Sequence, residues 1–308
     1  MKRLGHAGGI PILAGLFVAN VLWAANPVMT KYLLADFEPL QVAWLRVTAS
    51  AAVLGIGWFA FAAPKQTGKP SAGDGVFFRA ALMGAIVFYL TPLLITYGLD
   101  ASVAKHNSLI TGMEPVVTIV LAWIILRERL GARRWLTVLI ALAGFILLSG
   151  GAGGDGSTSY FLGDMLLLTA MAGEAMYSII GKDMVRRVHP VAILAIALAT
   201  GALCLSLQLA VTGALPHASQ FTPRGLGALL WAGPVATAGC YAYWLACLRH
   251  IPVHAAALSL FLQPLLGAVL GYTLMHDRLS AMQWTGGGMI LLGLAVHVMM
   301  VEQRPTTS

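Results

Sequence analysis

The sequence predicts an all-α integral membrane protein of ten transmembrane helices, arranged as two five-helix repeats with the second inverted. Three observations predict this fold: the composition, an internal repeat about half the chain long, and the distribution of Lys and Arg between apolar runs. The 308 residues are 58% hydrophobic and 10% charged. A soluble domain would carry about 25% charged residues, so the composition indicates a polytopic membrane protein.

Ten apolar runs are long enough to cross a membrane. A bilayer core about 30 Å thick needs roughly 20 apolar residues per helix. On that rule the expected spans are 10–32, 39–61, 76–98, 103–126, 134–150, 163–181, 190–213, 225–248, 254–275 and 283–301. The first run follows Lys2 and Arg3 but continues too far for a signal peptide, so we interpret it as a retained helix.

The second half of the chain repeats the first. One offset of 149 residues aligns Glu114-Pro115 with Gln263-Pro264, Glu128 with Asp277, Leu130 with Leu279, Trp135 with Trp284, and Gly144 with Gly293. So many matches in one register predict a duplication. We therefore expect a first repeat at 1–150 and a second at 151–308 in one compact bundle. The glycine-rich stretch 150–160 is interpreted as a linker, because no Lys-Ser/Thr follows it as in a phosphate-binding loop.

The basic residues predict the orientation in the membrane. With the N-terminus inside, fourteen Lys and Arg residues fall inside and four outside, namely Lys31, Lys105, Arg224 and Arg278. Cytoplasmic segments carry the excess of Lys and Arg, so both termini are expected in the cytoplasm. Five spans per half is an odd number, so the second half enters upside down. Inverted repeats are typical of transporters whose halves rock about a site near the midplane.

Three ionisable side chains fall inside expected spans: Arg46, Glu114 and Glu174. Each costs at least about 2.5–3.5 kcal/mol to insert near the bilayer centre, which marks a functional role. Arg46 has two compatible roles, an ion pair with Glu114 or a site for a carboxylate, which a guanidinium holds through two hydrogen bonds. Glu174 could bind a substrate amine, carry a coupling proton, or serve as a neutral hydrogen-bonding acid in the bundle.

A polar stripe on the fourth span differs between the two copies. It comprises Asn107, Thr111, Glu114 and Thr118, which share one helical face. Its counterparts are Ala256, Leu260, Gln263 and Gly267, so the sequence predicts one asymmetric site. Pro115 and Pro264 each remove a helix hydrogen bond and free a carbonyl, so both are predicted helix kinks.

The predicted substrate-binding residues combine these charges with polar and aromatic residues of other spans. They are Asn26, Arg46, Tyr89, Asn107, Thr111, Glu114, Glu174, Tyr177, Tyr241, Trp244 and Gln263. The four aromatic residues lie well inside their spans, where a cavity wall is expected. The histidines and the three cysteines (Cys204, Cys240 and Cys247) lack metal-ligand spacing, so we expect no metal and no cofactor.

Several motifs resemble the EamA-type drug/metabolite transporter superfamily over nearly the whole chain. They are Trp23 with Lys31, Pro39 followed by Arg46, Pro115, Pro264, and the closings Glu128-Arg129-Leu130 and Asp277-Arg278-Leu279. The resemblance implies a multi-pass carrier of the bacterial inner membrane, usually an exporter, with a central cavity lined by both halves. The chain is similar to the aromatic-amino-acid exporter branch, which makes amino acids the expected substrate.

The expected function is therefore secondary export of small metabolites by alternating access. An alternative cargo is an amphipathic drug or a sugar- or nucleotide-like metabolite held by fit to an apolar cavity. A non-transporting scaffold or a membrane enzyme is the alternative of another class, but no nucleophile, base and metal ligands converge at one depth. The expected partners are a small-molecule substrate and the lipid bilayer. Proton coupling and downhill export fit equally well. No nucleic acid is expected as a partner, because the basic residues are scattered in short loops between apolar runs. A monomer is expected.

Overall fold

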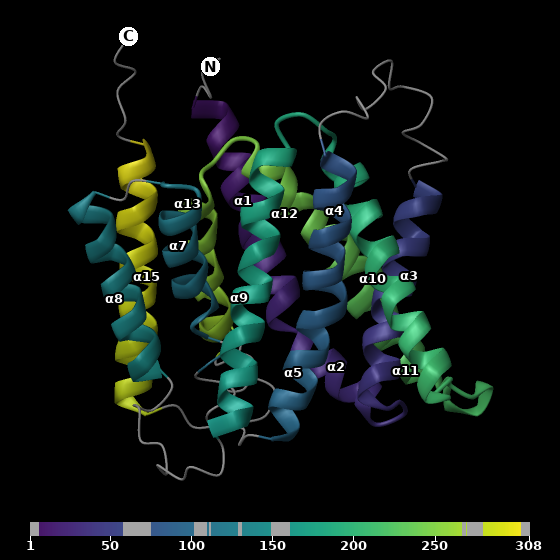
Figure 1. Ribbon diagram of the computed structural model, residues 1–308. Coiled ribbons are helices and arrows are strands. Elements are labelled where there is room, and N and C mark those ends of the chain that lie inside the picture. Colours follow the sequence, from purple (N-terminus) through teal and green to yellow (C-terminus); the bar gives the residue numbers. More distant parts are fainter. Residues whose placement is uncertain are drawn as a thin grey trace.

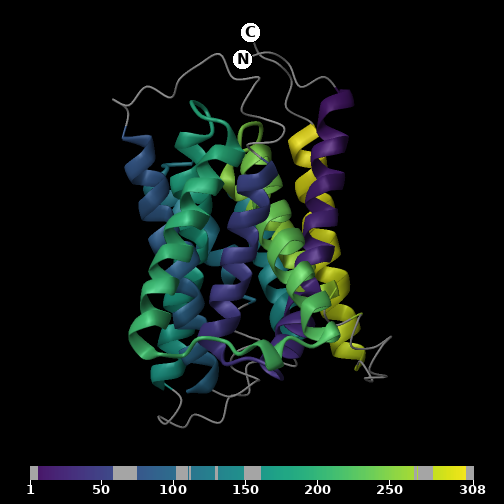
Figure 2. The same cartoon turned by 90° about the vertical axis from the view of Figure 1, so that its right-hand side faces the viewer.

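The structure is a computed structural model that describes residues 6–57, 75–101, 110, 112–128, 131–148, 161–266, 269 and 280–302. The helices form a bundle and run roughly along its long direction. The start of α1 and the end of α15 lie at the same end of the bundle (Figures 1 and 2). No β-strand occurs among these described residues. The all-helical class is therefore confirmed, while the count of ten spans and the inversion of the second half stay predictions.

The first half comprises α1 (His6–Ala24), α2 (Asn26–Leu34), α3 (Pro39–Gly57), α4 (Val76–Ala85), the π-helical turn η3 (Ile86–Leu90), α5 (Thr91–Asp100), α7 (Glu114–Ile125) and α8 (Ala132–Leu148). Local sequence explains several starts. Proline stands at the first positions of α2, α5 and α7, where its missing N–H has no helical partner to lose.

The second half comprises α9 (Phe161–Met184), α10 (Pro190–Thr212), the 3-10 turn η5 (Ala218–Gln220), α11 (Pro223–Leu230), the π-helical segment η6 (Trp231–Gly239), α12 (Cys240–Leu248), α13 (Val253–Leu258), the 3-10 turn η7 (Ser259–Phe261) and α15 (Ala281–Glu302). α10 ends at Gly213, whose φ of 70° is the left-handed conformation that terminates helices. The Thr222 side chain caps α11 by accepting a hydrogen bond from the Gly225 amide.

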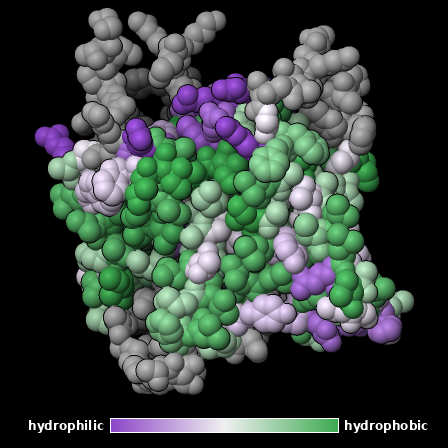
Figure 3. All heavy atoms as spheres, in the orientation of Figure 1, coloured by the Kyte–Doolittle hydropathy of each residue, from purple (hydrophilic) through white to green (hydrophobic). Residues whose placement is uncertain are grey.

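The surface is that of a protein surrounded by lipid. Three described helices are long and apolar enough to cross a membrane: Pro39–Ile56, Val76–Ile95 and Pro190–Thr212. Large apolar side chains point outward, for example Phe77 at 72% and Val211 at 88% exposure. On the face in Figure 3, hydrophobic residues cover the middle and hydrophilic residues gather at the upper rim and at the lower right.

Several expected spans are interrupted rather than continuous. The first breaks at Ala25, between α1 and α2. The third and the eighth contain η3 and η6, where the Thr91 hydroxyl donates to the Ile86 carbonyl (2.8 Å) and the Thr237 hydroxyl to the Ala232 carbonyl (2.7 Å). Each bond reaches five residues back, so the hydroxyl pairs a carbonyl in a turn where the α-helical ladder is disrupted.

The two predicted kinks differ from a bend in one continuous helix. α7 begins at Glu114, so Pro115 stands in its first turn instead of its interior. In the second copy, η7 precedes Pro264 and interrupts the α-helical ladder. The prolines therefore mark helix discontinuities, which sequence periodicity cannot separate from kinks because both leave the apolar run intact.

One close pairing of helices, α8 with α15, joins the halves through two reciprocal contacts. Gly144 of α8 packs on α15, where an added Cβ would lie 2.6 Å from the Gly286 carbonyl oxygen. Gly293 of α15 packs back on α8, and its Cβ would lie 3.1 Å from the Thr137 carbonyl oxygen. The repeat offset of 149 relates Gly144 to Gly293 and Thr137 to Gly286, so one contact occurs twice with the halves exchanged.

The same exchange occurs deeper in the bundle. Gly84 of α4 packs on the Ala197 carbonyl of α10, and Gly233 of η6 packs on the Arg46 carbonyl of α3. Gly84 and Gly233 are again 149 residues apart, and Arg46 and Ala197 are 151 apart. Because these glycines have no side chain, the helix backbones touch, and this close approach fixes the depth of Arg46.

Candidate functional site

A cavity of about 370 Å³ lies between helices of the two halves. α2, α3, η3 and α5 contribute from the first half, and α9, η6 and α12 from the second. Its lining comprises Thr30, Leu34, Pro39, Val42, Ala43, Arg46, Val47, Val87, Phe88, Pro92, Ile95, Glu174, Thr237 and Tyr241. The volume is within the range of small-molecule sites, roughly 300–1,000 Å³.

The cavity extends from one end of the bundle toward its middle. Leu34 and Pro39 flank the turn between α2 and α3 and are exposed, so they form the mouth of the cavity. Arg46 lies seven residues further along α3, a depth of about 10 Å at 1.5 Å per residue. The charged residues of the lining therefore lie well below the mouth.

The inner part of the lining holds a cation and a carboxylate within electrostatic reach of each other. The Glu174 carboxylate and the Arg46 guanidinium interact electrostatically. The Tyr241 hydroxyl donates a hydrogen bond to Glu174 Oε2 at 2.9 Å. The Tyr177 hydroxyl in turn donates to the Tyr241 carbonyl oxygen at 2.8 Å. This chain of bonds fixes the Glu174 carboxylate and orients the Tyr241 ring.

Arg46 has a hydrogen-bond donor without a partner. Its Nε atom is buried and makes no hydrogen bond. A buried donor without a partner costs free energy, and an adjacent cavity lets a ligand supply the missing acceptor. The site is therefore suited to an anionic group such as a carboxylate, which accepts charge-assisted hydrogen bonds from a guanidinium.

Of the two roles considered for Arg46, the ion pair with Glu114 does not form between these two described residues. The ion pairs of described residues include Arg79–Asp183 and Glu128–His254, and neither involves Arg46 or Glu114. Glu114 begins α7, which packs against α9 and α13. The charged group that acts on Glu114 is Glu174, so the carboxylate near Arg46 comes from α9.

Tyr177 and Trp244 lie behind the cavity wall and support it. Tyr177 is 2% exposed and Trp244 is 3% exposed. Trp244 Nε1 donates to the Ser178 hydroxyl at 2.8 Å, which joins α12 to α9. The Tyr241 ring lies 5.3 Å from Trp23 and 5.4 Å from Phe88 between ring centroids. These edge-on and tilted contacts hold Tyr241 in an aromatic cluster.

The remaining predicted residues divide into three groups. Gln263 Nε2 donates to Asn20 Oδ1 at 3.2 Å, and Asn20 donates to the Ser259 hydroxyl at 3.0 Å, so Gln263 belongs to a second polar cluster between α1 and η7. Asn26 begins α2 with its Oδ1 buried and unpaired, and Tyr89 packs against the core. Asn107 and Thr111 lie outside the described residues.

Several lining residues carry no sequence signal. Thr30 and Thr237 are ordinary polar residues of apolar helices, and Phe88 is one of many aromatic residues in spans. Phe88 and Thr237 line the cavity on π-helical segments. A π-turn contains an extra residue, so every later side chain is rotated around the helix axis. A regular period of 3.6 residues therefore predicts the wrong face for these side chains.

Comparisons with known proteins agree with this architecture. The Uncharacterized transporter YwfM of Bacillus subtilis (strain 168) is 30% identical over 210 residues, which cover 67% of this chain and 68% of that protein. The Uncharacterized inner membrane transporter YedA of Escherichia coli (strain K12) is 24% identical over 299 residues, 93% of this chain and 90% of that protein. A crystal structure of a protein 21% identical superimposes with a TM-score of 0.74 and covers 94% of this chain and 99% of that chain, so the two share a fold.

The family match covers nearly the whole chain, in two segments. The EamA-like transporter family matches residues 10–150 and again residues 161–299. Family and relatives point to a membrane transporter rather than an enzyme. The chain belongs to the EamA-like transporter family.

Proposed function

We propose that this protein exports small metabolites, in the first place amino acids, across the bacterial inner membrane by alternating access at the 370 Å³ cavity. The observation that carries the proposal is the buried Arg46 Nε, which lacks an acceptor beside the Glu174 carboxylate. An amino acid carries both complements: its carboxylate pairs with Arg46 and its ammonium with Glu174. The aromatic cluster around Tyr241 favours the aromatic-amino-acid exporter branch.

Two inverted five-helix repeats, 1–150 and 151–308, are the proposed machinery. The separate family matches at 10–150 and 161–299 support the duplication. The reciprocal packing of Gly144 and Gly293 supports a two-fold relation between the halves. Discontinuous helices such as those at Pro115 and Pro264 are typical of carriers with a site near the midplane.

The proposed orientation places both termini in the cytoplasm and the cavity mouth outside. At the end where α1 begins and α15 finishes, α4 also begins and α9 and α12 end (Figure 1). Arg79, Lys182 and Arg249 lie at these helix ends. A cytoplasmic surface is enriched in Lys and Arg. The Leu34–Pro39 mouth lies at the other end, so the proposed state faces outward. We propose that the carrier works as a monomer.

Flux through liposomes containing the purified protein tests the substrate class. Labelled aromatic amino acids should be transported, and Arg46→Ala should lower that flux about 100-fold, since hydrogen bonds to charged groups contribute ~1.5–3 kcal/mol each. Arg79→Ala is the matched control, because this arginine is half-exposed at the rim. Its flux should equal that of the unchanged protein. No flux of any amino acid from folded protein would refute the amino-acid proposal.

An amphipathic or sugar-like cargo is the second candidate, and the apolar lining favours it. Val42, Val87 and Ile95 cover much of the wall between the mouth and Arg46. A cargo held by apolar fit does not need the guanidinium, so Arg46→Ala would leave its flux nearly unchanged. An imposed pH gradient in the same vesicles tests coupling: a proton antiporter responds to the gradient, whereas downhill export ignores it.

A further inference from the structure

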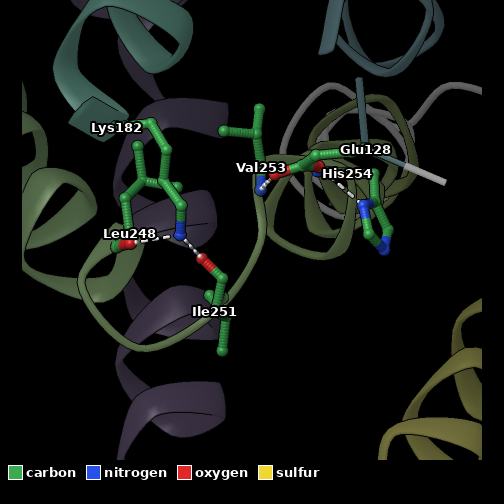
Figure 4. Close-up of polar contacts among 6 residues, drawn as sticks. All are labelled: Glu128, Lys182, Leu248, Ile251, Val253 and His254. Carbon is green, nitrogen blue, oxygen red and sulfur yellow. Dashed lines mark hydrogen bonds and ion pairs between the residues drawn. The ribbon is translucent and has the colours of Figure 1, made fainter. Parts of the chain in front are cut away.

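The end of the bundle opposite the mouth is tied across the two halves by a carboxylate on a helix start (Figure 4). Glu128 follows α7, in the first half. Its Oε1 accepts a hydrogen bond from the Val253 amide at 3.0 Å and its Oε2 one from the His254 amide at 3.1 Å. Both amides open α13, in the second half. Pro252, the residue at the cap position, supplies no side-chain bond itself, so Glu128 acts as the cap.

The same carboxylate also holds the His254 ring. His254 Nδ1 lies 2.6 Å from Glu128 Oε2. Because an ionised carboxylate only accepts, the ring must donate from Nδ1. The His254 side chain is 4% exposed and that of Glu128 is 13% exposed. Exclusion of water strengthens such a charge-assisted contact relative to one at the surface.

Lys182 completes the arrangement on the neighbouring helix end. Its ammonium donates to the Leu248 carbonyl at 2.5 Å and to the Ile251 carbonyl at 2.6 Å. Unpaired carbonyls carry partial negative charge at a helix C-terminus and unpaired amides partial positive charge at an N-terminus. Lys182 and Glu128 thus match opposite helix ends, and they attract each other. The α12–α13 connection is held from both sides.

We infer that Glu128 is the latch of this end: its contact with α13 holds the two halves together opposite the cavity, and the transport cycle must break it. The inference rests on the proposed alternating access, in which each end opens in turn. A contact that joins the halves at the closed end cannot persist when that end opens. The Arg79–Asp183 pair also joins the halves there, but its side chains are 54% and 50% exposed, and exposed pairs contribute little.

Glu128→Gln tests the latch with a change that keeps size. An amide oxygen can cap one N–H, but its NH₂ group faces the other donor, so the closed state should lose roughly tenfold in population. The measurement is amide hydrogen exchange of the purified full-length chain without substrate. Exchange should rise over 249–262, and it should fall over 35–41 and 213–222 at the mouth.

The fall at the mouth separates a latch from a local cap. Loss of a cap alone would raise exchange at the start of α13 and leave the mouth unchanged, and that outcome overturns the inference. No change at either end overturns it as well. Asp183→Asn is the matched control and should leave both ends as they are.

A second variant covers the case in which Glu128→Gln does not fold. His254→Ala removes the ring but leaves both backbone bonds to Glu128, so a smaller change of the same sign is expected at both ends; its absence at the mouth counts against the latch. The assay needs no substrate. An absence of amino-acid flux would therefore refute the proposed substrate only. The hydrogen-exchange result would still test the latch.

Discussion

The two ends of the bundle are joined by different chemistry. At the mouth, neutral side chains donate to a residue of a loop. The Thr222 hydroxyl donates to Asp36 Oδ2 at 2.6 Å, and Gln220 Nε2 donates to the Asp36 carbonyl at 2.9 Å. At the closed end, Glu128 and Lys182 bind helix termini directly. The mouth contacts lie between α2 and α11 and leave the cavity open beside them, whereas the latch joins α7 to α13.

This difference indicates which contacts would change between the two states of the proposed alternating access. The mouth bonds of Asp36 with Gln220 and Thr222 also join the two halves, but they are present while this end is open, so they do not hold it closed. A carboxylate on a helix start can hold only while α13 lies close to α7. Four substitutions or conditions, from the largest expected effect to the smallest, test the contrast.

Gly84→Leu should have the largest effect, because both ends depend on the helix crossing it occupies. A side chain there meets the Ala197 backbone of α10, and overpacking of a close crossing costs about 3 kcal/mol or more. Thermal unfolding should shift down by several degrees, with protection lost at both ends together. Gly227→Ala, whose added Cβ meets open space on α11, is the control. Loss confined to one end would contradict the shared crossing.

Tyr241→Phe should lower transport through the cavity and leave the contact of Glu128 with α13 unchanged. The change removes the hydroxyl that donates to Glu174, so the carboxylate loses its orientation and flux should fall about tenfold. Tyr243→Phe is the matched control, since that hydroxyl bonds to the Pro11 carbonyl, away from the cavity. Equal flux losses in the two variants would remove Tyr241 from the site.

Acid should weaken the latch before it affects the cavity mouth. Burial by itself would raise the pKa of the Glu128 carboxyl, but hydrogen bonds from His254 and Val253 outweigh it and hold that pKa below its usual value. A lowered pKa means that the ionised carboxylate stabilises the folded protein above the ordinary value of about 4.3, and that this stability is lost as pH falls through the lowered pKa.

Hydrogen exchange over 249–262, corrected for its intrinsic pH dependence, should therefore stay constant from neutral pH down to about 5 and rise below about 4. The groups that face Glu128 are the His254 ring on α13 and the Lys182 ammonium on α9, with Arg186 beyond Lys182. Glu128→Gln should abolish the pH dependence. A dependence that survives this substitution would assign it to a neighbour.

Asp183→Asn should have the smallest effect of the four. It breaks the Arg79 pair at the closed end, which spans 2.7 Å between half-exposed side chains. Surface pairs contribute about 0–1 kcal/mol, so thermal unfolding should move by no more than about a degree or two. A larger shift would mean that the rim, and not Glu128, holds this end closed.

Several helix ends were predictable because their signals are local. The expected spans 39–61 and 190–213 begin where α3 and α10 begin, at Pro39 and Pro190. Gly213 ends α10 by taking a conformation that other residues avoid. The expected span 10–32 ran through the break at Ala25 although Asn26-Pro27 marks it locally, because apolar residues resume after this pair. The π-helical segments were not predicted, because the run of apolar residues continues around them.

The candidate site was predictable in its charges but not in their partners. Arg46 and Glu174 stand out because a charge in a span is costly wherever it faces. That Glu174 and not Glu114 lies near Arg46 depends on how α9 packs between the halves. Glu128 belonged to the repeated motif, yet its contact is with residues 125 and 126 positions away, which no local pattern encodes.

Composition, charge distribution and the repeat thus determined the all-helical membrane class and which residues were too costly to be incidental, because transfer free energies and positional preferences act on single residues. Tertiary structure alone decided which side chains reach the cavity, and that Glu128 and Lys182 bind helix ends. Those outcomes depend on contacts between distant segments, whose free energies exist only when the helices are packed.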